Sequence, residues 1–201
     1  MRTATVRTTL GALCLIPAVT ASTGARRPAL TLQPESRLWV DGTSTVRSFS
    51  CAASALDASV ETTAPGAASA VMQGEKAVRA ATLTVPAERL DCRNGTMNEH
   101  MRKALKVEEH PTITFRVASY ELSAVGATTT GSATGALTLG GVEKPITVTG
   151  GVTRDASGAL RIAGSHRLRM TEYGIKPPSL MMGTMKVRDE VTVHFDLLLK
   201  G

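Results

Sequence analysis

Hydrophobic and polar residues alternate along most of the chain, most clearly near its C-terminal end. There the apolar residues recur at every second position: Val191, Val193, Phe195, Leu197 and Leu199. Side chains at every second position of a β-strand lie on the same face, so this period indicates a strand with one face buried. Shorter stretches with the same period are separated by glycine, proline and aspartate turns. The spacing predicts roughly eight to ten antiparallel strands in a barrel or a sandwich, a mainly β fold.

Residues 95–117 break this pattern, because they change from a helical period to a strand period. Thr96 followed three residues later by Glu99 predicts a capping box at a helix start. Pro111 prevents the helix from continuing, and from Thr112 the period is again two. We therefore expect one short helix beside the strands. Its single apolar stripe recurs every fourth residue: Met97, Met101 and Leu105.

The first residues are typical of a secretory signal peptide. Arg2 and Arg7 precede an apolar run over 10–19, and small residues allow cleavage after residue 21 or as late as 25. Cys14 raises the alternative of a lipid anchor, but Leu13 before it is a poor match to that processing. The run is too short for a permanent membrane span. We expect a signal peptide over 1–21, a flexible leader over 22–35 and one barrel domain over 36–201, exported to the periplasm or secreted.

The overall composition narrows the function classes. The chain has 201 residues, of which 42% are hydrophobic and only 3% aromatic, with a formal charge of +6. Such a chain can form one domain with an aliphatic core. The positive charge is scattered along the strands rather than gathered in blocks, which argues against a nucleic-acid-binding protein.

Two cysteines, Cys51 and Cys92, remain if the first segment is removed. An even number of cysteines in an oxidising compartment favours a disulfide over two buried thiols. Closing a loop of this length would stabilise the fold by roughly 4 kcal/mol in the chain-entropy model. We predict the disulfide Cys51–Cys92.

Several histidines and methionines could carry chemistry. His100 and His110 could meet a phosphate or a metal near a barrel mouth, whereas His194 should face solvent. Thioethers can hold Cu(I), so the methionines suggest metal handling as an alternative function, although methionine also fills apolar cores and pockets. These methionines are Met97, Met101, Met170, Met181, Met182 and Met185. No nucleophile elbow or glycine-rich phosphate loop is present, so we predict no catalytic residue and no cofactor. No CxxC pair or Cys/His ligand cluster is present, so we predict no metal site.

Several ordered blocks resemble the YceI-like family of polyisoprenoid-binding, lipocalin-like exported proteins. The opening strand is similar over 39–49, and residues 97–115 resemble the family's helix and following strand. The segment 134–145, TGALTLGGVEKP, and the segment 172–175, EYGI, occur in the same order as in the family. Residues 51–74 do not match the family pattern. The order and spacing of the blocks carry the resemblance, since each block alone is weak.

The resemblance implies an elongated, lipocalin-like antiparallel barrel with a flanking helix and a hydrophobic tunnel. Alternation alone would favour a filled core; the resemblance favours a tunnel that binds an isoprenoid-type or other long apolar lipid without catalysis. A metal-handling protein and an envelope scaffold with a filled barrel stay as alternatives, and self-association as a homodimer stays open. The predicted tunnel residues are Leu83, Val85, Met97, Met101, Ile113, Phe115, Val117, Leu137, Leu139, Ile146, Val148, Val193, Phe195 and Leu197.

Overall fold

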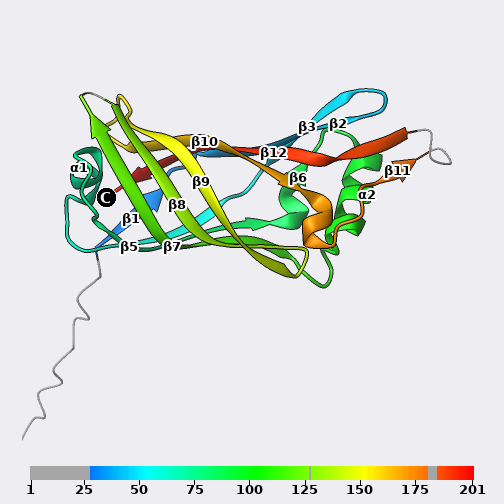
Figure 1. Ribbon diagram of the computed structural model, residues 1–201, viewed down its shortest axis with the longest axis horizontal. Coiled ribbons are helices and arrows are strands. Elements are labelled where there is room, and N and C mark those ends of the chain that lie inside the picture. Colours follow the sequence, from blue (N-terminus) through cyan, green and yellow to red (C-terminus); the bar gives the residue numbers. More distant parts are fainter. Residues whose placement is uncertain (1–27, 127, 181–184) are drawn as a thin grey trace, which may run out of the picture.

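The computed structural model describes residues 28–126, 128–180 and 185–201, and these residues form an elongated β-barrel (Figure 1). Eight antiparallel strands make the closed ring, because β12 pairs with β1 as well as with β10. In ring order they are β1 (Ala29–Leu32), β4 (Asp57–Thr62), β5 (Val78–Pro86), β7 (Thr112–Val125), β8 (Thr128–Leu139), β9 (Val142–Arg154), β10 (Leu160–Arg169) and β12 (Met185–Lys200). The lipocalin-like barrel predicted from the sequence is confirmed.

Four further strands extend the barrel at one end. β2 (Arg37–Ser44) pairs with β12, β3 (Ser48–Ala53) pairs with β2, and the short β6 (Leu90–Asp91) pairs with β3. β11 (Ser179–Leu180) pairs with the start of β12. The 16-residue β12 makes this possible, since one edge pairs first with β2 and then, at its last residues, with β1.

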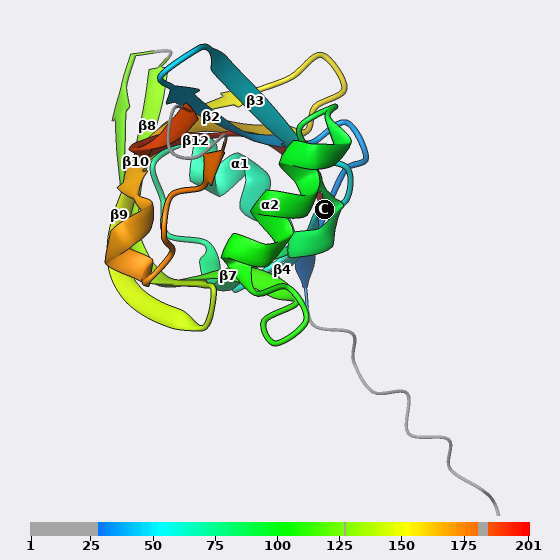
Figure 2. The same cartoon turned by 90° about the vertical axis from the view of Figure 1, so that its right-hand side faces the viewer.

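Two α-helices lie at opposite ends of the barrel (Figure 1). α2 (Gly95–Leu105) is the helix expected from the sequence, and viewed along the barrel it crosses in front of the opening (Figure 2). The predicted capping box is wrong: the cap is Asn94, whose side-chain oxygen accepts a hydrogen bond from the backbone N–H of Met97. The helix begins before Thr96, so Thr96 lies in the first turn, and Glu99 pairs with Lys103 one turn later.

α1 (Ala67–Met72) was not expected from the sequence. It has six residues, begins after Gly66 in the left-handed conformation, and has no side-chain cap. A helix this short shows only one repeat of the helical period, here Ala67 and Val71, which are its buried residues. Two short 3-10 turns, η1 (Ala87–Arg89) and η2 (Met170–Tyr173), complete the elements.

Part of the expected flexible leader is ordered. Residues 29–32 form β1, which pairs with β4 and with the end of β12, and the side chain of Leu30 is buried. Four residues are too few for alternation to be recognised in the sequence, so the barrel domain begins earlier than predicted. The expected signal peptide and residues 22–27 lie outside the described residues. Within the described part of the chain, no helix is long and apolar enough to cross a membrane.

The buried apolar side chains form two clusters rather than one. The α2-end cluster contains Leu38, Val85, Ala87, Leu90, Leu105, Leu139, Leu168, Tyr173, Ile175 and Val191. The α1-end cluster contains Leu30, Val60, Ala67, Val71, Ala77, Val152, Leu160 and Leu199. Each cluster packs around one of the two helices, so the two ends of the barrel are filled separately.

Candidate ligand tunnel

A cavity of about 420 Å³ is lined by inward-facing side chains from most strands of the barrel and from α2. Its lining is mostly aliphatic and includes residues of both packed clusters. The alternation seen in the sequence has a direct structural meaning here: along most of each long strand, one parity lines the cavity while the other faces outward. On β12, Val191, Val193, Phe195, Leu197 and Leu199 all line it.

All fourteen residues predicted for the tunnel lie on the cavity wall. Met97 and Met101 contribute from α2, and the other twelve come from β5, β7, β8, β9 and β12. Their contact with a ligand stays a prediction. The structure shows that, on each of these strands, the residues predicted to point into the barrel do line its cavity.

Two glycines make room for an aromatic ring inside the barrel. Gly164 on β10 lies opposite Gly150 on β9 and opposite Phe195 on β12. A β-carbon on Gly164 would collide with the ring of Phe195 and with the backbone of β9. The ring therefore lies against bare backbone, which explains why these strands tolerate glycine in their interiors.

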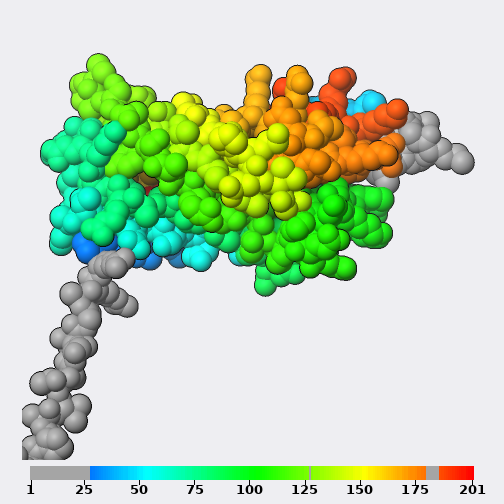
Figure 3. Space-filling view, turned by 60° about the horizontal axis from the view of Figure 1, so that its bottom comes forward, coloured from blue at the N-terminus to red at the C-terminus, as the bar shows by residue number. Residues whose placement is uncertain are grey.

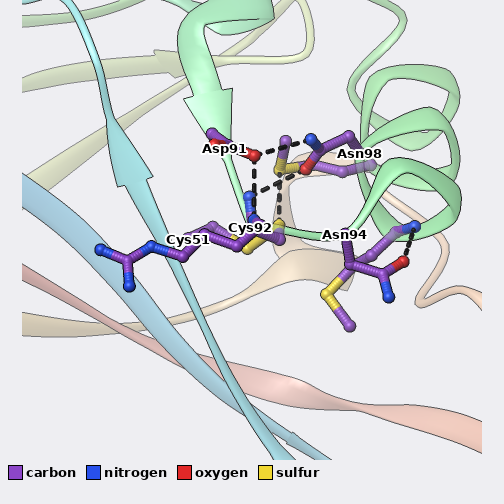
Figure 4. The surroundings of a disulfide bond; sticks show 8 residues. Cys51, Asp91, Cys92, Asn94 and Asn98 are labelled. Atoms are coloured by element: carbon purple, nitrogen blue, oxygen red, sulfur yellow. Dashed lines mark hydrogen bonds between the residues drawn. A yellow bond between two sulfur atoms is a disulfide. The ribbon is translucent and has the colours of Figure 1, made fainter.

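A disulfide holds the α2 end of the cavity. Cys51 on β3 is bonded to Cys92, as predicted, and Cys92 lies three residues before the first residue of α2 (Figure 4). Both cysteines line the cavity, and the sulfur of Cys92 lies 3.8 Å from the thioether sulfur of Met101. The bond therefore joins the barrel wall to the helix that covers its end.

Hydrogen bonds around the disulfide fix the start of α2 (Figure 4). The side-chain oxygen of Asn98 accepts from the backbone N–H of Cys92 at 2.8 Å, and its amide nitrogen donates to Asp91 at 2.8 Å. The hydrogen bond from Asn98, followed by that from the backbone of Arg93, lowers the pKa of the Asp91 carboxyl. A charged Asp91 thus helps to keep Asn98 in place.

The α1 end is closed without a covalent link among the described residues. Val71 reaches the cavity from α1, and Leu30, Leu160 and Leu199 surround it from the strands. The hydroxyl of Thr129 donates to the carbonyl of Met72 at 2.9 Å, joining the end of α1 to β8.

The barrel wall is not paired throughout. β5 and β7 pair from Pro86–Thr112 to Thr82–Arg116, and no ladder pair joins them beyond that point. There the backbone N–H of Val78 donates instead to the hydroxyl of Tyr120 at 2.9 Å, and Lys76 pairs with Glu121 at 2.7 Å. We call this gap the β5–β7 seam.

The seam lies between the main cavity and the outside. A second hollow of about 160 Å³ lies along it and shares four lining residues with the main cavity: Val78, Ala81, Val117 and Tyr120. In the space-filling view, dark red atoms from the C-terminal end of the chain are visible through a small hollow between teal and green surface (Figure 3). At the seam the wall is closed by contacts that involve side chains, not by a backbone ladder.

One polar side chain on the tunnel wall was missed as a site residue. His166 on β10 lines the cavity and is half-buried, and burial lowers the pKa of its imidazole. The sequence did hold a signal, because His166 has the same parity as Leu160, Ile162 and Leu168. A histidine at an inward position of an otherwise apolar strand face points to a polar group inside the barrel.

The other histidines lie in different surroundings. His100 on α2 lines the cavity, while the ring of His110 lies against Gly141 in the β8–β9 turn and does not line it. His194 is half-buried on the outer face of β12, where its ring stacks on Trp39 with centroids 5.0 Å apart and Nε2 lies 3.2 Å from Asp41. It is therefore packed against neighbours rather than fully solvated.

Only some of the methionines that suggest metal handling have described side chains. Met170 lines the cavity together with Met97 and Met101. Met181 and Met182 lie outside the described residues, and the side chain of Met185 is not described. Among the described residues, no group of three or more His, Cys, Asp or Glu side chains could hold a metal ion.

Solved structures with the same fold share little sequence with this chain. *Burkholderia cenocepacia* BcnA has a TM-score of 0.63 at 19% identity, with 81% of this chain and 95% of that chain covered. A polyisoprenoid binding domain from *Saccharophagus degradans*, implicated in plant cell wall breakdown, has a TM-score of 0.65 at 15% identity, with 86% and 98% covered. The *Campylobacter jejuni* YCEI protein has a TM-score of 0.51 at 18% identity, with 72% and 80% covered.

At these identities the structural likeness shows the fold alone, and no curated protein matches the chain. The sequence itself carries the family assignment. The model of the YceI-like domain matches residues 38–199, from the second residue of β2 to the penultimate residue of β12. The match covers most of the chain, and the protein therefore belongs to the YceI-like family.

Proposed function

We propose that this protein binds one long apolar lipid, of the polyisoprenoid or quinone type, in its barrel tunnel and catalyses no reaction. The observation that carries the proposal is the cavity itself, an apolar space between two packed clusters and not a filled core. Burying a hydrocarbon chain there would contribute about 0.8 kcal/mol per methylene, so a long chain could bind tightly without any charged contact.

Two further observations support the proposal. Family membership makes a lipid-binding barrel the expected class, and one structural neighbour is described as a polyisoprenoid binding domain. The disulfide suits an oxidising compartment, which supports export to the periplasm or secretion. In such a compartment a long apolar lipid needs a carrier or a store, because water does not dissolve it.

The test is lipid recovery from protein expressed with its N-terminal segment intact. Native mass spectrometry followed by solvent extraction should show one apolar lipid per chain. A variant with a blocked tunnel, Val148→Trp, should lose it, because Val148 faces the cavity from β9. The matched control is Thr147→Trp. Thr147 is the residue before Val148 on the same strand, and its side chain is exposed and does not line the cavity. Circular dichroism should show that both variants fold.

Three outcomes are informative. Lipid in the wild type and in Thr147→Trp but not in Val148→Trp would support the tunnel. An empty wild-type protein that also fails to take up added lipid would overturn the proposal and favour a scaffold. Copper retained by the purified protein, with no lipid, would favour the metal-handling alternative.

A further inference from the structure

We infer that His166 forms a polar subsite inside the tunnel and that the ligand carries an uncharged oxygen function, a carbonyl or hydroxyl group, at that depth. This inference rests on the proposed lipid binding and specifies its ligand class. On β10, Leu160 belongs to the α1-end cluster and Leu168 to the α2-end cluster, and His166 lies between them on the same face. The imidazole therefore lies inside the barrel, nearer to the α2-end cluster than to the α1-end cluster.

The imidazole has no partner within the protein. Among the described residues it makes no hydrogen bond, ion pair or ring contact, whereas His194 on the outer face has both an acidic and an aromatic neighbour. Every fully buried side-chain nitrogen or oxygen in the described residues has a hydrogen-bond partner. The nitrogens of His166 have none, so they are not fully buried, and the residue lines the cavity.

An unpartnered imidazole in an apolar wall costs free energy unless something in the cavity satisfies it. Burial is the only cause acting on its pKa, which it lowers, so no charged group in the described structure stabilises an imidazolium there. The neutral ring offers one N–H donor and one nitrogen acceptor. An uncharged carbonyl or hydroxyl oxygen matches it, whereas a phosphate would be held better by a fixed cation.

The neighbouring strand adds an aromatic surface. His166 lies opposite Val193 on β12, and Phe195, two residues further along the same face, lies against Gly164. Diagonal neighbours in an antiparallel pair are within reach of aromatic side chains. An imidazole beside a phenyl ring suits an alcohol or a ring that carries carbonyl oxygens, such as a quinone.

The experiment compares two probes with the same carbon skeleton, phytol with a terminal hydroxyl and phytane with none. Delipidated protein is titrated with each, using displacement of Nile red as the readout. Wild-type protein should prefer phytol, and His166→Leu should weaken phytol binding about fivefold, the net effect of one hydrogen bond. Phytane should bind His166→Leu as well as or better than the wild type. His166→Gln, which keeps a donor and an acceptor, should retain part of the preference.

The matched control is Ile162→Val, which removes one methylene from the same face of β10 and should weaken both probes equally. Equal binding of phytol and phytane by the wild type, with no selective effect of His166→Leu, would overturn the subsite while leaving the tunnel function intact. If neither probe binds, the proposed function itself fails. Tighter binding of phytyl phosphate than of phytol, lost in His166→Leu, would contradict the uncharged ligand class.

Discussion

The two ends of this barrel are closed by helices that differ in length, in capping and in covalent attachment. α2 has 11 residues, a side-chain cap from Asn94 and a disulfide three residues before its start. α1 has 6 residues, no side-chain cap, and no disulfide among the described residues. One end is held covalently and by a polar network, the other by apolar packing and isolated hydrogen bonds such as that from Thr129.

The helices also differ in what they present to the cavity. α2 lines it with Met97, His100, Met101, Ala104 and Leu105, whereas α1 contributes Val71 alone. The α2 end is therefore part of the ligand wall, and the α1 end is a plug. A wall that includes a flanking helix needs that helix held in place, because few of its side chains are fully buried. The disulfide supplies this restraint without filling the space that a ligand would use.

The largest predicted effect comes from removing the covalent link. The double variant Cys51→Ala/Cys92→Ala should lose about 4 kcal/mol of unfolding free energy, because the closed loop between the two cysteines no longer restricts the unfolded chain. Urea unfolding followed by circular dichroism measures the loss. Wild-type protein in a strong reductant is the control and should unfold at the same midpoint. A loss of unfolding free energy below about 1 kcal/mol would mean that the α2 end, like the α1 end, does not depend on a covalent link for its stability.

A smaller effect is expected from truncating one buried side chain at each end. Leu105→Ala should cost about 3 kcal/mol and Val71→Ala about 2 kcal/mol, from lost burial and the cavity left behind. Each substitution is then repeated in the disulfide-free background. The cost of Leu105→Ala should change there, because the bond restrains the helix that carries Leu105, while the cost of Val71→Ala should be additive. Coupling of Val71 to the disulfide would contradict independent ends.

The sequence predicted the long strands and their inward faces well, for a physical reason. In β9 and β12 the tunnel-facing residues are apolar and the outward ones mostly polar, so the period of two repeats many times. Leu83, Val85 and their counterparts on the other strands were placed on the correct face by this repeat alone. Long strands with one solvated face are the elements that alternation describes best.

The elements that were missed are short or depend on contacts distant in sequence. β1 has four residues and α1 has six, so neither repeats its period enough to be recognised. Asn94 was overlooked as a cap because Thr96 and Glu99 matched a familiar spacing two residues later. The β5–β7 seam depends on how the two strands diverge beyond the pair Thr82–Arg116, which no local pattern encodes. His166 shares the parity of the apolar residues on its strand, but a single histidine on that face does not by itself show that the face borders a tunnel.

The smallest predicted effect concerns acid sensitivity at the two ends. At the α2 end, Asp189 on β12 accepts hydrogen bonds from the backbone N–H and the hydroxyl of Thr171 in η2, and these lower the pKa of its carboxyl. At the α1 end, the side chain of Ser157, the largest cause, and backbone N–H groups of the same turn lower the pKa of Asp155. A carboxyl whose pKa is lower in the folded state stabilises the protein above its unfolded pKa of about 3.9, and this stabilisation is lost as the pH falls through the folded value.

Both Asp189→Asn and Asp155→Asn should therefore flatten the rise of the urea midpoint between roughly pH 2 and pH 5. Both residues are only half-buried at the surface, so each change should be small. Asp189→Asn should also move the thermal midpoint at neutral pH more than Asp155→Asn does, because Asp189 joins β12 to η2, whose Tyr173 belongs to the α2-end cluster. Asp155 holds only a surface turn between β9 and β10. A larger effect of Asp155→Asn at neutral pH would mean that the hydrogen bonds of Asp189 do not make the α2 end more stable than the α1 end. Any extra stability of the α2 end would then come from the disulfide alone.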